Sequence, residues 1–145
     1  MGGLFSAMDV SASAMTAHRK RLQLLVTNLA NAQTTRTEEG GPYRRKDVVL
    51  KTKSFEPFWK VLAEVGREEL EGVEIEQVIT DSKPPVMVYE PNHPDADASG
   101  FVAYPNVNPL EEMANFMASK RSYESNIRAF EAIKELVRKS LEIGR

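Results

Sequence analysis

The chain has 145 residues and a formal net charge of −2, with 28% charged residues of both signs and no cysteine. This length suits one domain, and the mixed charge provides no global field that would recruit nucleic acid or an anionic membrane. The lack of cysteine excludes disulfides, thiolate metal sites and a cysteine nucleophile, and it suits a protein that crosses an oxidising compartment.

The first predicted element is a helix over residues 3–31. Its apolar residues recur every seven positions, at Met8, Met15, Leu22 and Leu29. This spacing keeps one apolar stripe towards a neighbouring helix, as in coiled coils. Serine and alanine fill much of the remaining surface, so other helices can approach closely from several sides. Asn31 is expected to end the helix, because short amide side chains compete for backbone hydrogen bonds.

The middle of the chain is predicted to be β-rich. Residues 34–43 have turn composition, with glycines that tolerate positive φ followed by a proline. Strands are expected at residues 45–52, 73–80 and 86–89, from β-branched residues and period-two alternation. The pattern at residues 55–70 fits either a short helix or the tip of a long hairpin. Residues 89–108, which are dense in proline, asparagine and aspartate, are expected to form an ordered loop.

A second long helix is predicted over residues 109–141. Asn108 is expected to be its N-cap, and Pro109 occupies a favoured first-turn position. Its apolar stripe consists of Met113, Phe116, Met117, Tyr123, Ile127, Phe130, Ile133, Val137 and Leu141. Lys120 and Lys134 interrupt one heptad position, which indicates lysine stems that pack while their amines reach water.

Candidate sites for chemistry are weak. Residues 95–100 match the first half of a calcium-binding loop, but Asn106 stands where the bidentate glutamate belongs. The two histidines, His18 and His93, lack the spacing of a metal site, and no glycine-rich phosphate loop occurs. The basic cluster 44–46 is offset by neighbouring acids. We therefore expect no cofactor, no bound metal and no nucleic-acid partner.

The first residues do not show a basic segment followed by a continuous apolar stretch, so we expect no cleaved signal peptide, and no apolar run is long enough to span a bilayer. We therefore expect no direct membrane insertion, and any export must use a route that cleaves no signal.

Several segments resemble one protein family. Residues 28–35, NLANAQTT, resemble the motif that follows the first helix in the axial proteins of the bacterial flagellum, the rod and hook family. Residues 35–46, 89–97, 100–108 and 120–126 are similar to the proximal-rod member of that family. The motifs occur in the family's order along the chain, which is more specific than one motif alone.

The resemblance implies a non-enzymatic structural subunit of the basal-body proximal rod. Such a subunit passes through the flagellar type III export apparatus without a cleaved signal. It joins other copies of itself and neighbouring rod proteins in a helical tube across the periplasm, which serves as a hollow drive shaft and export channel. The resemblance also implies that the terminal helices line the tube and that the middle forms its outer layer.

The expected fold is α+β. Long N- and C-terminal helices (1–33 and 109–145) are expected to pack as a coiled coil beside a small β-rich middle domain (34–108). We hypothesise that the ends order only on assembly, because apolar burial then offsets the entropy of fixing them. The predicted assembly interface consists of Met8, Met15, Leu22, Leu25, Asn28, Leu29, Asn31, Thr34, Tyr104, Met113, Phe116, Tyr123, Ile127, Phe130, Val137 and Leu141.

Two other classes of protein remain as alternatives. A soluble adaptor that binds partners through a terminal helical hairpin has the same apolar spacing, and its two helices would pack tightly in the monomer. A small enzyme is less favoured, because it needs a pocket with convergent polar groups, whereas the polar residues here are scattered over turns.

Overall fold

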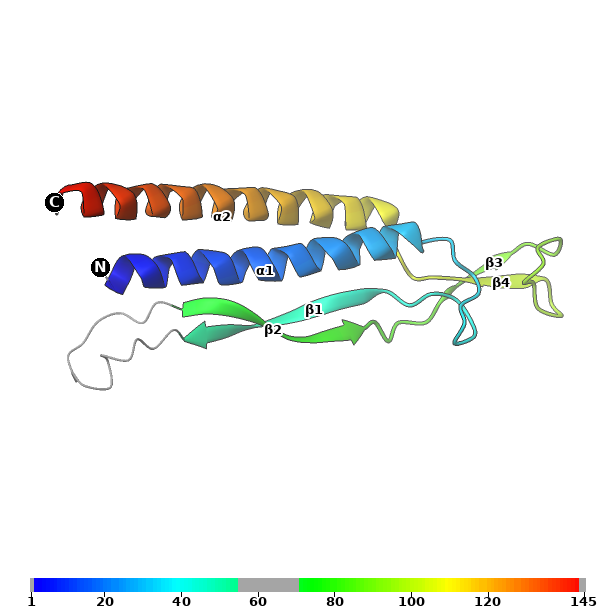
Figure 1. Cartoon of the computed structure of the whole chain (residues 1–145). Coiled ribbons are helices and arrows are strands. Elements are labelled where there is room, and N and C mark those ends of the chain that lie inside the picture. The colour runs from blue at the N-terminus through cyan, green and yellow to red at the C-terminus, as the bar shows by residue number, and fades with distance from the viewer. Residues whose placement is uncertain (1, 55–70, 144–145) are drawn as a thin grey trace.

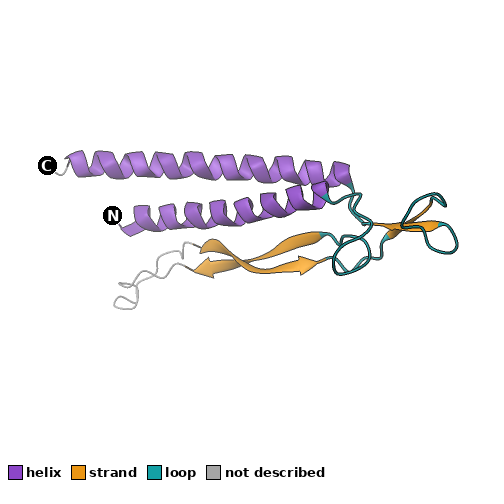
Figure 2. Ribbon diagram, turned by 45° about the vertical axis from the view of Figure 1, so that its right-hand side comes forward, coloured by secondary structure: helices purple, strands orange, loops and turns teal. Residues whose placement is uncertain are grey.

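A computed structural model of the chain describes residues 2–54 and 71–143 and shows an elongated α+β molecule (Figure 1). Two long helices, α1 (Gly2–Ala30) and α2 (Pro109–Ile143), lie side by side and antiparallel (Figures 1 and 2). The strands are β1 (Lys46–Ser54), β2 (Glu71–Thr80), β3 (Val86–Tyr89) and β4 (Phe101–Tyr104). The predicted α+β class is confirmed, while coiled-coil packing of the helices stays a prediction. The alternatives for residues 55–70 fall outside the described residues.

The ends of both helices follow the predicted local chemistry. The backbone N–H and side-chain amide of Asn31 both donate to the carbonyl of Thr27, at 3.1 and 2.9 Å, just after the last helical residue. At the start of α2, the Asn108 side chain accepts a hydrogen bond from the Leu110 N–H at 3.1 Å. Asn108 is therefore the N-cap, as predicted.

Helix α1 lies between α2 and the ribbon formed by β1 and β2 (Figure 1). Small side chains allow this close packing. Ala17 and Ser11 are buried, and the hydroxyl of Ser13 accepts a hydrogen bond from the Val73 N–H of β2 at 3.1 Å. Of the helices and strands in the described residues, α2 packs only against α1, so much of its surface is open.

The β1–β2 ribbon is antiparallel and contains one irregularity. Val49 pairs with Gln77 and Leu50 pairs with Ile75, which leaves Glu76 as an extra residue in β2. Such a bulge changes the alternation of faces along a strand. The single apolar face predicted for residues 73–80 is therefore interrupted, and Ile79 is exposed whereas Val73 is half-buried.

Strand β4 corrects the prediction of a continuous loop at residues 89–108. It pairs in register with β3, from Val86 opposite Tyr104 to Tyr89 opposite Phe101. The short run FVAY is too brief to show periodicity by itself, and it becomes a strand because β3 supplies a partner. The β3–β4 pair, called the distal ribbon below, projects past the ends of the helices (Figures 1 and 2).

The molecule exposes much more surface than a compact protein of its size. The whole chain of 16.2 kDa has an accessible area of 10598 Å², against about 7,500 Å² expected for a compact monomer of that mass. The buried apolar side chains among the described residues are few, namely Ala17, Leu24, Leu25, Tyr43, Val102 and Val107. The fold thus leaves a large area for other contacts.

Candidate functional site

The best-satisfied polar group in the described structure is the side chain of Asn28, which is fully buried near the end of α1. Its amide nitrogen donates to the Lys46 carbonyl at 2.8 Å and to Glu112 Oε2 at 2.9 Å. Its amide oxygen accepts from the Tyr43 hydroxyl at 2.9 Å and from the Lys46 N–H at 3.0 Å. Both donors and both lone pairs of the amide are therefore used.

Glu112 lies beside Asn28 in the first turn of α2 and is only 1% exposed. Its second carboxylate oxygen accepts a hydrogen bond of 2.6 Å from Arg45 Nε. The same guanidinium contacts Asp47 at 3.2 Å. Burial lowers the pKa of Arg45, but the hydrogen bond and ion pair with Glu112 outweigh this effect and hold the pKa above its ordinary value.

These residues (Asn28, Tyr43, Arg45, the Lys46 backbone and Glu112) form one connected unit, the Asn28 network. It joins the end of α1, the residues just before and at the start of β1 and the beginning of α2. Burial of its hydroxyl, together with the nearby Glu112 charge, raises the pKa of Tyr43, so the phenol remains a donor to Asn28. Because every member is hydrogen-bonded, the network fixes the position of the end of α1 relative to the start of β1 and the start of α2.

The residues of the predicted assembly interface occupy three kinds of environment. Leu25 and Asn28 are buried within the chain, whereas Leu29, Met113 and Leu141 are exposed. Half-buried positions are Met8, Met15, Leu22, Asn31, Thr34, Tyr104, Phe116, Tyr123, Ile127, Phe130 and Val137. Leu25 and Asn28 thus serve the interior of the subunit, and the role of the whole set in assembly stays a prediction.

The exposed face of α2 changes character along its length. Its first turns carry Leu110, Met113 and Met117, which are 79%, 54% and 53% exposed and share one face at i, i+3 and i+7. We call these three residues the outward α2 patch. Further along, the same face carries ion pairs, namely Lys120–Glu124 at 3.8 Å, Glu135–Lys139 at 3.1 Å and Arg138–Glu142 at 3.9 Å. The charged part is suited to water, and the apolar part is suited to a partner.

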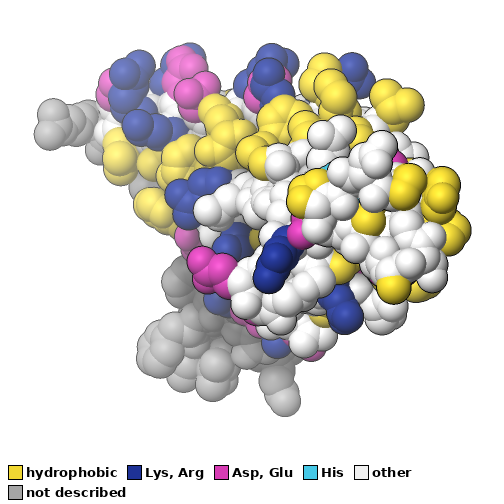
Figure 3. Space-filling model, turned by 90° about the vertical axis from the view of Figure 1, so that its right-hand side faces the viewer, with side chains coloured by type: hydrophobic (Ala, Val, Ile, Leu, Met, Phe, Trp, Pro, Cys, Tyr) yellow, Lys and Arg dark blue, Asp and Glu magenta, His cyan; other side chains and the backbone are white. Residues whose placement is uncertain are grey.

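The distal ribbon is a second exposed apolar surface. The exposed side chains are those of Val86, Met87, Val88, Tyr89 and Phe101, whereas Val102 is fully buried. Figure 3 faces the end from which the ribbon projects, and it shows hydrophobic side chains gathered over the helices and along one edge of the nearest part of the molecule. A two-stranded ribbon has little stability by itself, so an exposed apolar ribbon gains from being covered.

The loop after β3 folds back on itself and on the loop after α1. The Thr35 hydroxyl donates to Asp95 at 2.8 Å, so two segments 60 residues apart are joined. Gly100 has a φ of 82°, and a Cβ at this position would lie 2.9 Å from a ring carbon of Tyr89. The Tyr104 hydroxyl donates to Glu90 at 3.0 Å, and this bond raises the pKa of the phenol.

The acids of this loop serve its backbone. The Asp97 carboxylate accepts hydrogen bonds from the N–H groups of Ser99 and Phe101, at 2.8 and 2.9 Å. Within residues 2–54 and 71–143 no three or more acidic or histidine side chains converge as a metal site would require. The Asp97 carboxylate is thus used within the turn.

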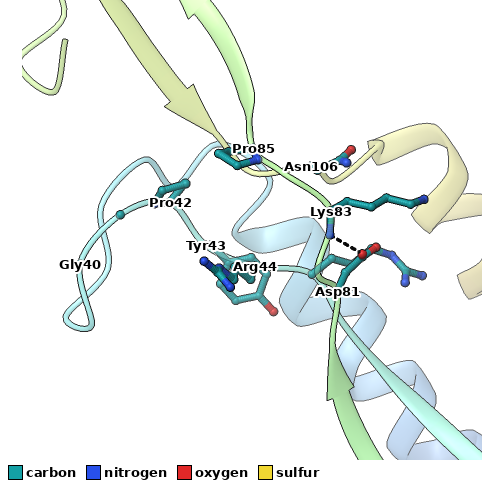
Figure 4. Close-up of a pocket in the computed structure, with 10 residues that line it drawn as sticks. Gly40, Pro42, Tyr43, Arg44, Asp81, Lys83, Pro85 and Asn106 are labelled. Carbon is teal, nitrogen blue, oxygen red and sulfur yellow. Dashed lines mark hydrogen bonds between the residues drawn. The ribbon is translucent and has the colours of Figure 1, made fainter. Parts of the chain in front are cut away.

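The pocket in Figure 4 lies between the loop from Gly40 to Arg45 and the segment that joins the two ribbons. Its volume is about 100 Å³, well below the roughly 300 Å³ at which ligand sites begin. The dashed bond marks the Lys83 N–H donating to Asp81 at 2.9 Å, which shapes the turn at its edge. It is a hollow at a junction of loops.

No helix of the described residues has both the length and the apolar character needed to cross a bilayer.

Sequence reasoning missed three members of the Asn28 network. Glu112 is not among the residues that the sequence analysis singles out, and Arg45 appears there only in the basic cluster 44–46. Tyr43 was assigned only to a turn. No spacing rule connects these residues, because they meet only after α1 and α2 lie together. The motif NLANAQTT contained the one available signal, an asparagine inside an otherwise apolar stripe.

Comparisons with known proteins agree on one family. Residues 98–143 match the family described as "Flagellar basal body rod FlgEFG protein C-terminal". The chain is 42% identical to the flagellar basal-body rod protein FlgC of Bacillus subtilis, over 97% of this chain and 98% of that protein. The FlgC proteins of Salmonella typhimurium and Borreliella burgdorferi are 38% and 34% identical, each over 97% of this chain and over 98% and 97% of their own lengths.

Proposed function

The chain belongs to the FlgC family of flagellar basal-body rod proteins, and from that premise we propose that it assembles through its terminal helices into the proximal rod. The family consists of structural rod components of the flagellar basal body and is not known to be enzymatic. In our proposal, copies of this chain and neighbouring rod proteins form a helical tube that transmits torque and serves as an export channel.

The observation that carries the proposal is the unburied surface. Large apolar side chains are exposed in separate places among the described residues, on α1, on α2 and on the distal ribbon. Such exposed apolar patches mark surfaces that contact other proteins. The open face of α2 and the exposed apolar side chains of α1, such as Phe5 and Val26, support contacts on more than one side.

The remaining parts of the proposal concern the export route of the chain and the compartment in which it assembles. We propose that the chain leaves the cytoplasm through the flagellar type III export apparatus without a cleaved signal peptide, and that it assembles in the periplasm. The balanced charge and the absence of cysteine support passage into an oxidising compartment. The small number of buried apolar side chains in the described residues supports a subunit that unfolds readily for export.

Substitution in the outward α2 patch tests the assembly. Met117→Asp places a carboxylate on an exposed surface, so the free protein should unfold at the same urea concentration as the unsubstituted chain. We then express this variant in a strain from which the gene for the unsubstituted protein has been deleted. We expect electron microscopy to show no complete rods and the cells to be non-motile, because the new carboxylate would be buried without a partner in the interface.

Ala132→Asp is the matched control, since Ala132 is exposed on the charged part of α2. It should support motility. Normal rods from Met117→Asp would contradict the proposal. The adaptor alternative predicts that the deletion strain still builds a rod, and this outcome would favour it.

A further inference from the structure

The distal ribbon is attached to the rest of the molecule by few contacts. Among the described helices and strands, β3 and β4 contact only each other. Two short segments, residues 81–85 and 105–108, connect the ribbon to β2 and to α2. The ribbon therefore projects from the body as an arm (Figures 1 and 2). Because no described helix or strand packs against this arm, loops must set its direction, and a region with so few contacts moves readily.

The loop after α1 gives the arm a third support. Gln33 lines a shallow hollow together with Val88 of β3 and Tyr104 of β4. Two residues further on, the Thr35 hydroxyl donates a hydrogen bond of 2.8 Å to Asp95, in the loop that joins β3 and β4. The chain that leaves α1 thus runs along the ribbon and is bonded to its connecting loop.

The hydrogen bond from Thr35 is the specific part of this contact. Its acceptor is a carboxylate, and such charge-assisted hydrogen bonds are stronger than those between neutral groups. Arg36 also lies near the Asp95 carboxylate, at 4.0 Å, but its side chain is 82% exposed, and an ion pair of this kind contributes little. The hydroxyl of Thr35 is therefore the group that binds the ribbon to the loop.

Thr35 extends from a part of the chain that is itself fixed. The carbonyl of the preceding residue, Thr34, accepts a hydrogen bond from the Tyr43 N–H at 3.0 Å, and its hydroxyl donates to Asn31 Oδ1 at 3.1 Å. Tyr43 belongs to the Asn28 network, and Asn31 lies at the end of α1. The segment is thus tied to the body on both sides, and Thr35 passes this fixed position on to the ribbon.

We propose that the distal ribbon is an arm hinged at residues 81–85 and 105–108, and that the hydrogen bond between Thr35 and Asp95 is the latch that sets its angle to the helices. With the latch closed, the exposed apolar side chains of β3 keep one direction relative to α2. With the latch open, the arm changes its angle while the Asn28 network keeps the body folded. The latch acts within one chain, so its test does not depend on the proposed function.

Distances within the full-length free chain test the latch. Because the chain has no cysteine, spin labels can be attached at introduced thiols. Ala98→Cys lies in the loop of the ribbon and Ala114→Cys in the second turn of α2, and both positions are exposed. Pulsed electron paramagnetic resonance then measures the distribution of distances between the two labels. We expect a narrow distribution with Thr35 in place, and a broader one in Thr35→Val, which lacks the hydroxyl but has a similar shape.

Two further variants are matched controls. Thr35→Ser keeps a hydroxyl and should keep the narrow distribution. Thr37→Val removes a hydroxyl that donates within its own loop, to the Gly41 carbonyl at 3.2 Å, and should also leave the distribution narrow. An unchanged distribution in Thr35→Val would overturn the latch and show that the prolines of the hinge segments set the angle. An equally broad distribution in the labelled chain that retains Thr35 would overturn it as well.

A second substitution keeps the latch testable if Thr35→Val does not fold. Asp95→Ala should broaden the distance distribution as Thr35→Val does, and the two changes together should broaden it no further, because both remove the same bond. A double variant with a broader distribution than either single variant would contradict a single latch. Circular dichroism should show the same helix content in every variant, which separates an open latch from an unfolded body.

Discussion

The Asn28 network and the outward α2 patch occupy the same first turns of α2 but follow opposite rules of burial. Glu112 is 1% exposed and carries a charge, whereas Leu110, two residues away, is apolar and 79% exposed. A glutamate is almost never fully buried unless it is paired, and a patch of exposed large apolar side chains marks an interaction surface. The reversal indicates that the polar network sets the shape of the subunit, while the apolar side chains are available to its neighbours.

The difference also separates two physical roles. A buried ion pair adds little net stability compared with apolar residues of the same volume, but its breakage is costly. The network therefore favours one geometry of the α1–α2 pair over others. The outward α2 patch makes no directional bonds. It stabilises an assembly only when a partner removes its apolar surface from water.

Of the changes that test this difference, removal of the Glu112 carboxylate should lower the free energy of unfolding most. Glu112→Ala leaves Arg45 paired with Asp47 alone and removes an acceptor from Asn28, so we expect the free energy of unfolding to fall by about 3 kcal/mol, the lower end of the cost of breaking a buried ion pair. Urea denaturation followed by circular dichroism measures the change. Glu111→Ala, at the exposed neighbouring residue of the same turn, should change it by less than about 0.5 kcal/mol.

Replacement of both Arg45 and Glu112 tests whether the Asn28 network acts as a unit. Arg45→Met combined with Glu112→Leu should recover much of the lost stability, because neither charge then remains buried alone. If the double variant is as unstable as the sum of the single changes, the network contributes through individual bonds and not as a unit.

Asn28→Ala should have a smaller effect, a loss of about 1–3 kcal/mol, since it leaves the Tyr43 hydroxyl and the Lys46 backbone groups without their partner. Asn31→Ala is the matched control. Its side chain is only half-buried and bonds locally to Thr27 and Thr34, so its loss should cost less. Equal losses at the two positions would show that Asn28 acts only as a residue near a helix end.

Local chemistry made most of the fold predictable. Heptad spacing predicted both helices to within about two residues, and Asn108 and the glycines at 40 and 41 were placed correctly, with φ of 86° and 75° at the glycines. These features depend on a few adjacent residues. Strand β4 and the bulge at Glu76 were not predictable, because both depend on the strand opposite.

The candidate site was less predictable than the fold. The seven-residue ladder Phe116, Tyr123, Phe130 and Val137 is only half-buried, whereas Ser119 and Glu112, seven residues apart on an adjacent stripe, are among the most buried residues of α2. Periodicity identifies a face of a helix, but it does not say whether that face contacts the same chain or another copy. The polar partners of Asn28 come from two separate segments, residues 43–46 and the first turn of α2, and no pattern along the chain connects them.

His18 gives the smallest expected effect and tests whether the polar interior is satisfied throughout. Its Nδ1 is buried without a hydrogen-bond partner among the described residues, in contrast to the amide of Asn28. Burial, with a contribution from the nearby Arg21 charge, lowers its pKa below the ordinary value of 6.5. The unfolded chain therefore binds a proton at His18 more readily than the folded chain does.

It follows that the stability associated with His18 is complete from about one pH unit above 6.5, and that it is lost as the pH falls through 6.5 and below. We expect the free energy of unfolding to decline between about pH 7.5 and about pH 5.5, and the decline to be shallower in His18→Gln, which carries no proton in this range. Urea titrations of both proteins across that range measure the difference. Parallel curves would mean that the imidazole charges without cost, and that water or a neighbouring group satisfies it as fully as the network satisfies Asn28.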